Sequence, residues 1–343
     1  MKSRKNAIVA ISASLGMLML ILDSKTALEG AVQGVELCIR TVIPSLLPFF
    51  VLSILLTSTL TGSTISFLRP LGRLCGIPIG TESLLAIGLL GGYPVGAQNI
   101  HHAYEEGLIT KLEARRLLGF CNNAGPAFIF GITGGLFHSQ WCVWILWAIH
   151  IVSALIVSMI MPHKTSRRIT AASRGYMTLP MCLSRSVTVM GDVCGWIILF
   201  RVVLSFSERW FLWLLPDMLC AAAHGALELV NGCHFLYSIP SEGIRFVLCS
   251  AFLAFGGLCV AMQTVSVTGE LGTGWYFPGK ILQCIISILL SLPAQILLFP
   301  SNERLTDAAS LGMILAILIV MVLPFGAKLK KTVAFQRNLV YNK

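Results

Sequence analysis

The chain has 343 residues, of which 56% are hydrophobic and 12% are charged, and its mean hydropathy is +0.82. A soluble domain carries about 25% charged residues, so this composition excludes an ordinary soluble protein and predicts an all-α polytopic membrane protein. The formal net charge of +10 comes from basic clusters beside apolar runs. These clusters are typical of cytoplasmic anchors and not of a nucleic-acid surface.

Residues 1–40 are predicted to form an N-terminal span and an interfacial helix. The apolar run Ala7–Leu22 follows three basic residues and is similar to a signal peptide, but no A-x-A-like cleavage site follows it. We therefore favour an uncleaved first span with a cytoplasmic N-terminus. Thr26 and Glu29 have the spacing of a capping box, which predicts the start of the second helix.

Residues 41–162 are predicted to form a first structural repeat. An apolar run returns the chain to the cytoplasm near Leu60, and two later apolar stretches are broken by GGYPVG and NNAGP. Between these breaks, Thr110 and Glu113 form a capping-box pattern at the start of a polar helix. A full span, Trp141–Met161, closes the repeat, with tryptophans near its start as in an interfacial aromatic belt.

The rest of the chain divides into four predicted segments. They are a basic cytoplasmic loop (163–178), a second repeat (179–268), C-terminal spans (269–326) and a basic cytoplasmic tail (327–343). The N-terminus and the C-terminus are thus both expected in the cytoplasm.

The second repeat follows the order of the first: a span, a break, a helix with a basic residue and a second break. The separation from Gly92 to Gly125 is 33 residues, and that from Gly225 to Gly257 is 32. By the charge rule the first spans of the halves run in opposite directions, which indicates an inverted-topology repeat with broken helices or re-entrant hairpins. Glycine-interrupted helices that pack closely are the alternative explanation.

The breaks supply the candidate solute-binding residues. Helices broken at membrane depth persist where their free backbone groups are buried in protein or line a polar cavity, and transporters bind solutes and ions at such breaks. The candidate residues are Gly92, Tyr93, Pro94, Gly96, Asn122, Asn123, Pro126, Glu228, Asn231, Gly256, Gly257 and Gln263.

Glu228 is the only carboxylate between Asp217 and Glu242. An ionisable group at membrane depth is costly and indicates an ion or substrate site, so Glu228 is a candidate for a coupling ion, H⁺ or Na⁺. The alternative is a structural pair with His224, one turn earlier. For the asparagines near the breaks, the alternative role is helix capping.

Other polar residues give weaker indications. Four arginines could neutralise an anionic solute, although one of them, Arg185, is more simply a cytoplasmic anchor; the others are Arg115, Arg116 and Arg201. The scattered cysteines and histidines have no metal-ligand spacing, and no catalytic motif occurs. We therefore expect no enzyme activity, no metal site and no cofactor.

Five motifs, in their order along the chain, resemble the sporulation integral membrane protein family of the YlbJ or SpoVV type. They are PSLLPFF (44–50), GGYPVGAQ (91–98), CNNAGPAF (121–128), ALELVNG (226–232) and FGGLCVAMQ (255–263). That family carries the nucleoside-recognition, or gate, domain of spore maturation proteins, which is related to concentrative nucleoside transporters. The resemblance implies that the two repeats are of the gate type and that the chain is a homo-oligomer.

The resemblance implies a secondary transporter that moves dipicolinic acid across the outer forespore membrane of a spore-forming bacterium. One alternative keeps the transporter and changes the solute to a nucleoside or another small polar molecule. Another alternative is a membrane scaffold in spore maturation that transports nothing. In each case the expected surroundings are a lipid bilayer, with no nucleic acid.

Overall fold

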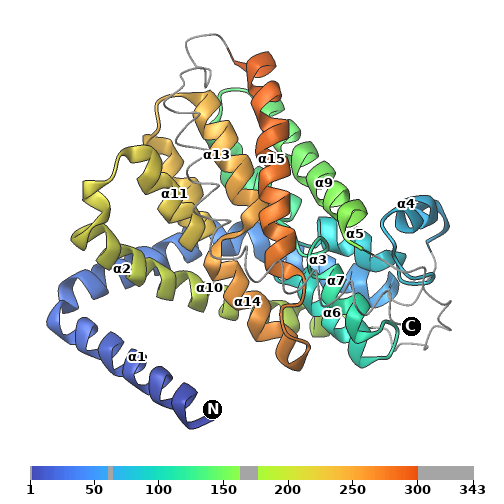
Figure 1. Cartoon of the computed structure of the whole chain (residues 1–343), viewed down its shortest axis with the longest axis horizontal. Helices are drawn as coiled ribbons and strands as arrows, with labels where there is room; N and C mark the ends of the chain where they lie inside the picture. Colours follow the sequence, from blue (N-terminus) through green and yellow to red (C-terminus); the bar gives the residue numbers. More distant parts are fainter. Residues whose placement is uncertain (1, 61–64, 163–176, 300–343) are drawn as a thin grey trace.

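The computed structural model describes residues 2–60, 65–162 and 177–299, and within these ranges it contains helices and turns but no β-strand (Figure 1). Five of the described helices are long and apolar enough to cross a membrane: Ser24–Leu60, Gln140–Ile160, Leu179–Trp210, Glu242–Leu271 and Tyr276–Leu298. The chain is therefore an all-α polytopic membrane protein. The predicted last span near residues 309–325, most of the basic loop and the basic tail lie outside the described residues.

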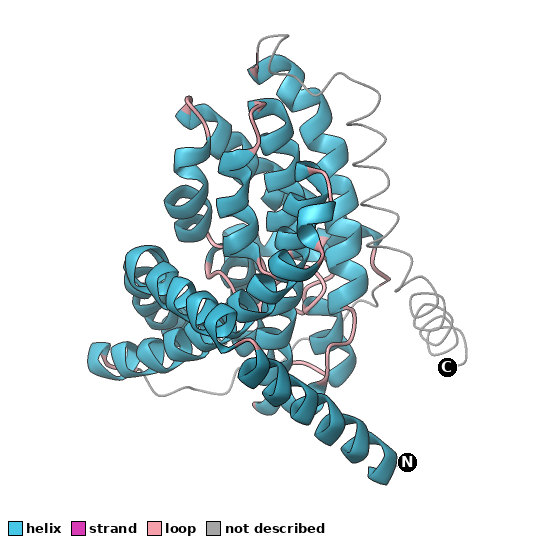
Figure 2. Cartoon of the chain, turned by 90° about the vertical axis from the view of Figure 1, so that its left-hand side faces the viewer, coloured by secondary structure: helices cyan, strands magenta, loops and turns pink. Residues whose placement is uncertain are grey.

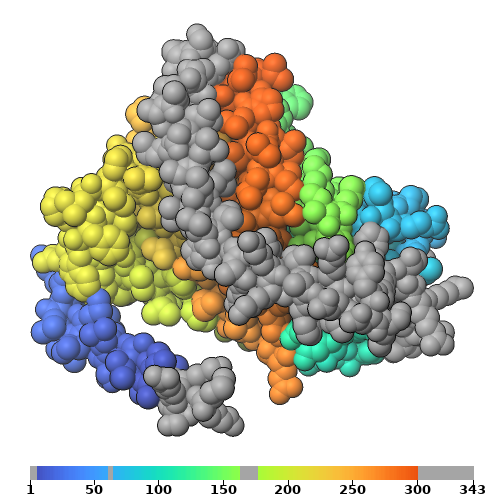
Figure 3. Space-filling view, viewed as in Figure 1, coloured from blue at the N-terminus to red at the C-terminus, as the bar shows by residue number. Residues whose placement is uncertain are grey.

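The N-terminal helix α1 (Lys2–Leu22) extends away from the body of the molecule (Figure 3). Its apolar part, Asn6–Leu22, is shorter than the five candidate spans, and its side chains are almost all exposed. The next helix, α2 (Ser24–Leu37), is capped by Asp23, whose carboxylate accepts a hydrogen bond from the Thr26 amide at 3.4 Å. The capping box predicted at Thr26 is therefore wrong, because the helix starts two residues earlier.

One long helix carries the chain across the predicted boundary at residue 41. α2 continues through a π-helical turn, Cys38–Val42, into α3 (Ile43–Leu60). The turn precedes Pro44, which has no amide to donate to the helix, and a wider turn at this point accommodates the proline ring. The interfacial helix and the first apolar run are thus one continuous element.

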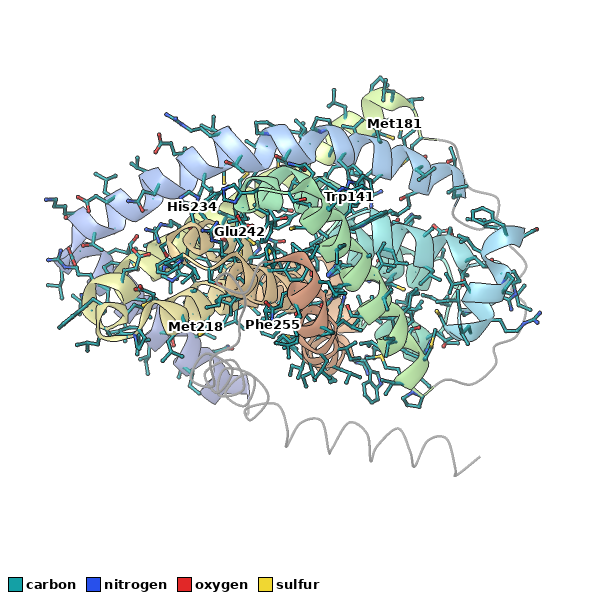
Figure 4. The ribbon with its side chains drawn as sticks, turned by 90° about the horizontal axis from the view of Figure 1, so that it is seen from above. Trp141, Met181, Met218, His234, Glu242 and Phe255 are labelled. Atoms are coloured by element: carbon teal, nitrogen blue, oxygen red, sulfur yellow. The ribbon has the colours of Figure 1, made fainter. Side chains whose placement is uncertain are left out.

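Helix α10 (Leu179–Trp210) packs antiparallel against this long helix. A Cβ atom at Gly34 would lie 2.9 Å from the Cα atom of Ile198, and Cys38 Sγ lies 3.9 Å from the Cys194 carbonyl oxygen. Viewed from above, the long helix runs along one edge of the molecule, and Met181 marks the start of α10 (Figure 4). The glycine allows the two backbones to approach closely, as small residues do between membrane helices.

The order of elements recurs in the two halves of the described chain. The first half has α3, a hairpin of α5 (Glu82–Leu90) and α6 (Val95–Glu105), a broken helix of α7 (Lys111–Leu117) and α8 (Pro126–Thr133), and the span α9 (Gln140–Ile160). The second half has α10, a hairpin of α11 (Asp217–Leu227) and α12 (Leu229–Phe235), a broken helix of α13 (Glu242–Phe255) and α14 (Gly257–Thr268), and the span α15 (Tyr276–Leu298).

Short elements connect these units. They are α4 (Arg69–Leu74) and the 3₁₀ turns Ser66–Leu68, Gly134–Leu136, Leu212–Leu214, Leu236–Ser238 and Gly269–Leu271. The capping box predicted at the start of α7 is confirmed, because the Glu113 amide donates to Thr110 Oγ1 at 3.2 Å and the Glu113 carboxylate accepts from the Thr110 amide at 2.7 Å.

The described elements are helices joined by loops (Figure 2), and the broken helix of the second half is the most buried of the five candidate spans. In the most apolar part of the segment Glu242–Leu271, 83% of the residues are buried, whereas this share is 22% to 44% in the other four candidate spans. α15 packs against both α13 and α9. The break in this segment is therefore enclosed by protein, which is the condition for irregular backbone at membrane depth.

Substituting Gly96 by Ala tests the close packing of the first hairpin. A Cβ atom at Gly96 would collide with the Cys121 carbonyl oxygen and lie 3.1 Å from Asn122 Cα. We expect Gly96→Ala to destabilise the protein by about 1–3 kcal/mol through overpacking, measured as a lower melting temperature in detergent. The control is Gly195→Ala on the exposed side of α10, where no atom lies within 4 Å; an equal loss in both variants would contradict the packing.

Candidate functional site

The four breaks predicted from the sequence meet at one place in the structure. A Cβ atom at Gly92, in the tip of the first hairpin, would lie 3.4 Å from the Gly125 nitrogen at the first break. A Cβ atom at Gly256, in the second break, would lie 3.2 Å from the Tyr93 hydroxyl. A Cβ atom at Gly257 would lie 3.4 Å from the Glu228 nitrogen in the second hairpin. Both hairpin tips and both helix breaks therefore belong to one site.

A small cavity, which we call the chamber, lies at this meeting point. Its volume is about 30 Å³, room for only a few water molecules at most, since one water needs about 10–15 Å³. In this conformation the chamber is thus too small to hold a solute. The residues that line it come from both hairpins, the first break, α3, α10 and α14, and include Gly92, Tyr93, Gly125, Glu228, Gln263, Phe50 and Val193.

Glu228 is buried and lies at the start of α12 with an extended backbone. Its carboxylate accepts hydrogen bonds from the Val230 amide (3.0 Å), the Asn231 amide (2.6 Å) and the Asn231 side chain (2.7 Å). No cationic side chain among the described residues forms an ion pair with it. The alternative pairing with His224 is wrong, because the His224 ring bonds to Glu208 (2.8 Å) and to the Cys220 carbonyl oxygen (2.8 Å).

A fully buried lysine, Lys280, lies beside Tyr93 and does not line the chamber. Lys280 Nζ donates to Asn123 Oδ1 at 2.9 Å and to Gln283 Oε1 at 2.8 Å, and it lies 5.4 Å from the centroid of the Tyr93 ring. That distance is within the range of a cation–π interaction. No carboxylate in residues 2–60, 65–162 or 177–299 forms an ion pair with this lysine. Lys280 is thus a buried cation whose partners are neutral.

Lys280 was not among the residues predicted from the sequence. The available signal was a single charged residue inside the apolar stretch 279–299, which by itself marks a functional candidate at membrane depth. The same signal was available at its neighbour His150, which lies inside the predicted span Trp141–Met161. The His150 ring accepts a hydrogen bond from the Ala124 amide at 3.1 Å through Nε2, so the other nitrogen, Nδ1, carries the proton, and it has no partner in the described structure.

The asparagines of the first break connect elements that are far apart in sequence. Asn122 accepts a hydrogen bond from the Ala97 amide in the first turn of α6 (3.2 Å) and donates one to Thr264 in α14 (3.0 Å). Asn123 donates to the Gly88 carbonyl in α5 (3.0 Å) and receives the Lys280 bond. Neither side chain caps α8, whose N-cap residue is Gly125 without a side-chain bond, so the local capping role is wrong.

The remaining predicted residues lie around the chamber or away from it. The Asn231 side chain donates a hydrogen bond to the Glu228 carboxylate. Gly256 and Gly257 form the turn of the second break. Pro94 and Gly96 are buried at the start of α6. Pro126 is half-buried and borders an apolar groove with Leu90 instead of the chamber. It therefore has a structural role at the start of α8.

Three of the four candidate arginines have protein partners. Arg116 donates to the carbonyl groups of Cys75 (2.8 Å) and Ser158 (2.7 Å), Arg115 donates to the Leu271 carbonyl (2.8 Å), and Arg201 pairs with Glu208 (2.6 Å). None of these arginines lines the chamber. Among the described residues no group of three His, Cys, Asp or Glu side chains could hold a metal ion.

Comparison with known proteins gives one relative. The chain is similar to the sporulation integral membrane protein YlbJ of Bacillus subtilis (strain 168), with 28% identity over 314 residues, covering 76% of this chain and 75% of the relative. No family model and no solved structure matches the chain. The similarity supports the YlbJ-type resemblance and a role as an integral membrane protein.

Glu228→Gln tests the carboxylate as an acceptor for the start of α12. A glutamine has one acceptor oxygen and an NH₂ group, and that group must face an N–H donor where the carboxylate now accepts. We expect the free energy of unfolding to fall by about 0.5–2 kcal/mol, the cost of losing an N-cap bond, seen as a lower melting temperature in detergent.

The matched control is Glu270→Gln, because Glu270 is exposed in the turn after α14. That variant should melt at the wild-type temperature. A Glu228→Gln protein that is as stable as wild type would show that the three hydrogen bonds to Glu228 do not need its charge.

Proposed function

We propose that the protein is a secondary membrane transporter of a small anionic metabolite, and that its solute is dipicolinic acid moved across the outer forespore membrane. The observation that carries this proposal is the small chamber at which both hairpin tips and both helix breaks meet. Discontinuous helices that converge at membrane depth form the solute and ion sites of secondary transporters. A scaffold has no need for this arrangement.

The buried lysine supports an anionic solute. A charged side chain at membrane depth costs about 2.5–3.5 kcal/mol on insertion scales, and the partners of Lys280 are two amide oxygens and the face of Tyr93. A carboxylate would be a stronger partner than any of these, because it adds the Coulomb attraction between two opposite charges to the hydrogen bond. Tyr93 lines the chamber, so movement of its ring would bring a solute carboxylate to Lys280.

Glu228 supports coupling to a cation. Its carboxylate lines the chamber, and its hydrogen bonds come only from neutral groups. A proton or a sodium ion that bound there would neutralise the carboxylate during passage of the solute. The coupling-ion site at Glu228 and the site for the solute carboxylate at Lys280 would then be two different sites.

Dipicolinic acid is proposed from the sporulation relative and from the five motifs that resemble its family. It is a planar aromatic ring with two carboxylates, which matches a cation beside a tyrosine ring. A nucleoside is the competing solute and carries no carboxylate. Uptake of each by vesicles that contain the purified protein separates the two, and uptake of neither would favour the scaffold.

Lys280→Met tests the anion site. Methionine keeps much of the side-chain volume but removes the charge, so we expect dipicolinate uptake into vesicles to fall at least tenfold, which is about 1.4 kcal/mol of lost stabilisation. The folded protein should persist, because an apolar side chain at a buried position carries no desolvation cost.

The control for this variant is Lys111→Met, at the exposed first residue of α7, which should transport at the wild-type rate. Wild-type uptake by Lys280→Met at equal protein abundance would remove Lys280 from the solute site.

Glu228→Gln tests coupling separately from folding. Each vesicle preparation supplies two rates, accumulation of dipicolinate against a gradient and exchange of labelled for unlabelled dipicolinate. If Glu228 carries the coupling ion, accumulation should be lost while exchange continues, and the ratio of the two does not depend on how much protein is folded. An unchanged ratio would contradict a coupling role for this carboxylate.

A further inference from the structure

Two clefts lie next to the chamber, one at each end of it. The Arg201 cleft has a volume of about 550 Å³ and is lined by Arg40, Thr41, Arg201, Glu208, Asn231 and His234. The Arg185 cleft has a volume of about 170 Å³ and is lined by Ile54, Thr57, Ser58, Asn99, His102 and Arg185. Each cleft is larger than the chamber and is bordered by the same two long helices.

The three cavities follow one another along the antiparallel pair. On the α2–α3 helix, Thr41 lines the Arg201 cleft, Phe50 lines the chamber and Ser58 lines the Arg185 cleft. On α10 the same sequence of cavities is met at Arg201, Val193 and Arg185. At a rise of 1.5 Å per residue the two clefts are roughly 25 Å apart on either helix, close to the roughly 30 Å of a bilayer's hydrocarbon core.

One hairpin separates each cleft from the chamber. In the second hairpin, Asn231 borders the Arg201 cleft, Glu228 lines the chamber, and the two side chains are bonded at 2.7 Å. In the first hairpin, Tyr93 lines the chamber and Asn99 borders the Arg185 cleft. Asn99 donates to the Thr57 hydroxyl of α3 at 3.3 Å. The tip of each hairpin thus faces the chamber, and the second helix of each hairpin, α6 or α12, faces a cleft.

We propose that the Arg201 cleft, the chamber and the Arg185 cleft form one solute path along the α3–α10 pair, with its two mouths on opposite faces of the membrane. The proposal rests on the transport function argued above. Each mouth carries basic and acidic side chains together, Arg201 with Glu208 at one end and Arg185 with Glu106 at the other, so both ends are polar enough to admit a hydrated solute. Asn231 and Asn99 are the positioning residues that hold the two hairpin arms across the path.

Sidedness of thiol labelling tests the path without requiring the identity of the solute. Thr41→Cys and Ser58→Cys are reconstituted in vesicles of one orientation and treated with a membrane-impermeant maleimide from either side. We expect each cysteine to be modified from one side only, and the two from opposite sides. Arg40→Cys is a second variant for the larger mouth. The unsubstituted protein gives the background, because ten native cysteines are buried and Cys194 is half-buried.

The matched controls are Ile39→Cys and Leu56→Cys, whose positions lie within two residues of Thr41 and Ser58 but are exposed on the outside of the helix, at 61% and 47%. In a bilayer these positions face lipid and should not react. Modification of Thr41→Cys or Ser58→Cys should also lower dipicolinate uptake at least tenfold.

The results of this experiment test the proposed path and the proposed solute independently. Opposite-sided labelling without dipicolinate uptake by any variant would support the path and reject the solute. Labelling of both positions from the same side would overturn the path, even in a protein that transports dipicolinate. Equal labelling of the lipid-facing controls, or labelling that leaves uptake unchanged in a transporting protein, would overturn it as well.

Discussion

The structure depends on satisfying backbone groups that are freed at helix breaks where no water is available. Each unpaired amide or carbonyl in that environment costs several kcal/mol. Here side chains from distant elements supply the partners. The Tyr93 hydroxyl donates to the Leu253 carbonyl at 2.9 Å, near the end of α13. Asn122 accepts from the start of α6, His150 accepts from the Ala124 amide, and Glu228 accepts from the start of α12.

The side chains that satisfy the breaks therefore lie beside the chamber. The groups that satisfy the breaks cannot be removed without exposing backbone, so any opening of the chamber must exchange their hydrogen bonds for others. A solute that carries acceptors and donors can provide such an exchange. Lys280 and Glu228 carry opposite charges, and neither has a charged partner in the described structure. A ligand of opposite charge would therefore stabilise each of them. In the proposed transporter, solute binding, ion coupling and folding would all depend on the same few residues.

The sequence was sufficient to locate the breaks, because glycine and proline determine backbone geometry locally. GGYP forms the tip of the first hairpin, and Gly256 and Gly257 have φ angles of +81° and +77°, which favour glycine. It was also sufficient to predict the membrane class, from composition alone. The continuous helix 24–60 was not predicted, because Pro44 and Pro48 suggested a boundary that the π turn and the helix accommodate.

The partners of the site residues could not be predicted from spacing. His224 lies one turn before Glu228, but α11 ends at Leu227, and the extended backbone of Glu228 directs its side chain to α12. The burial of Lys280 arises from α15 packing against the first break, a contact between residues 157 positions apart. Neither relation has a local sequence signature. For the same reason the spacing did not show that Asn122 and Asn123, whose alternative role was helix capping, bond to α6, α14 and α15.

Ligand-dependent melting of the purified protein tests most directly whether the chamber and Lys280 form an anion site. A ligand that binds only the folded state stabilises it by about 2.7 kcal/mol at one hundred times its dissociation constant. We expect dipicolinate to raise the melting temperature of the wild-type protein progressively with concentration, and to have no such effect on Lys280→Met. No rise in the wild type, or an equal rise in both proteins, would contradict the account.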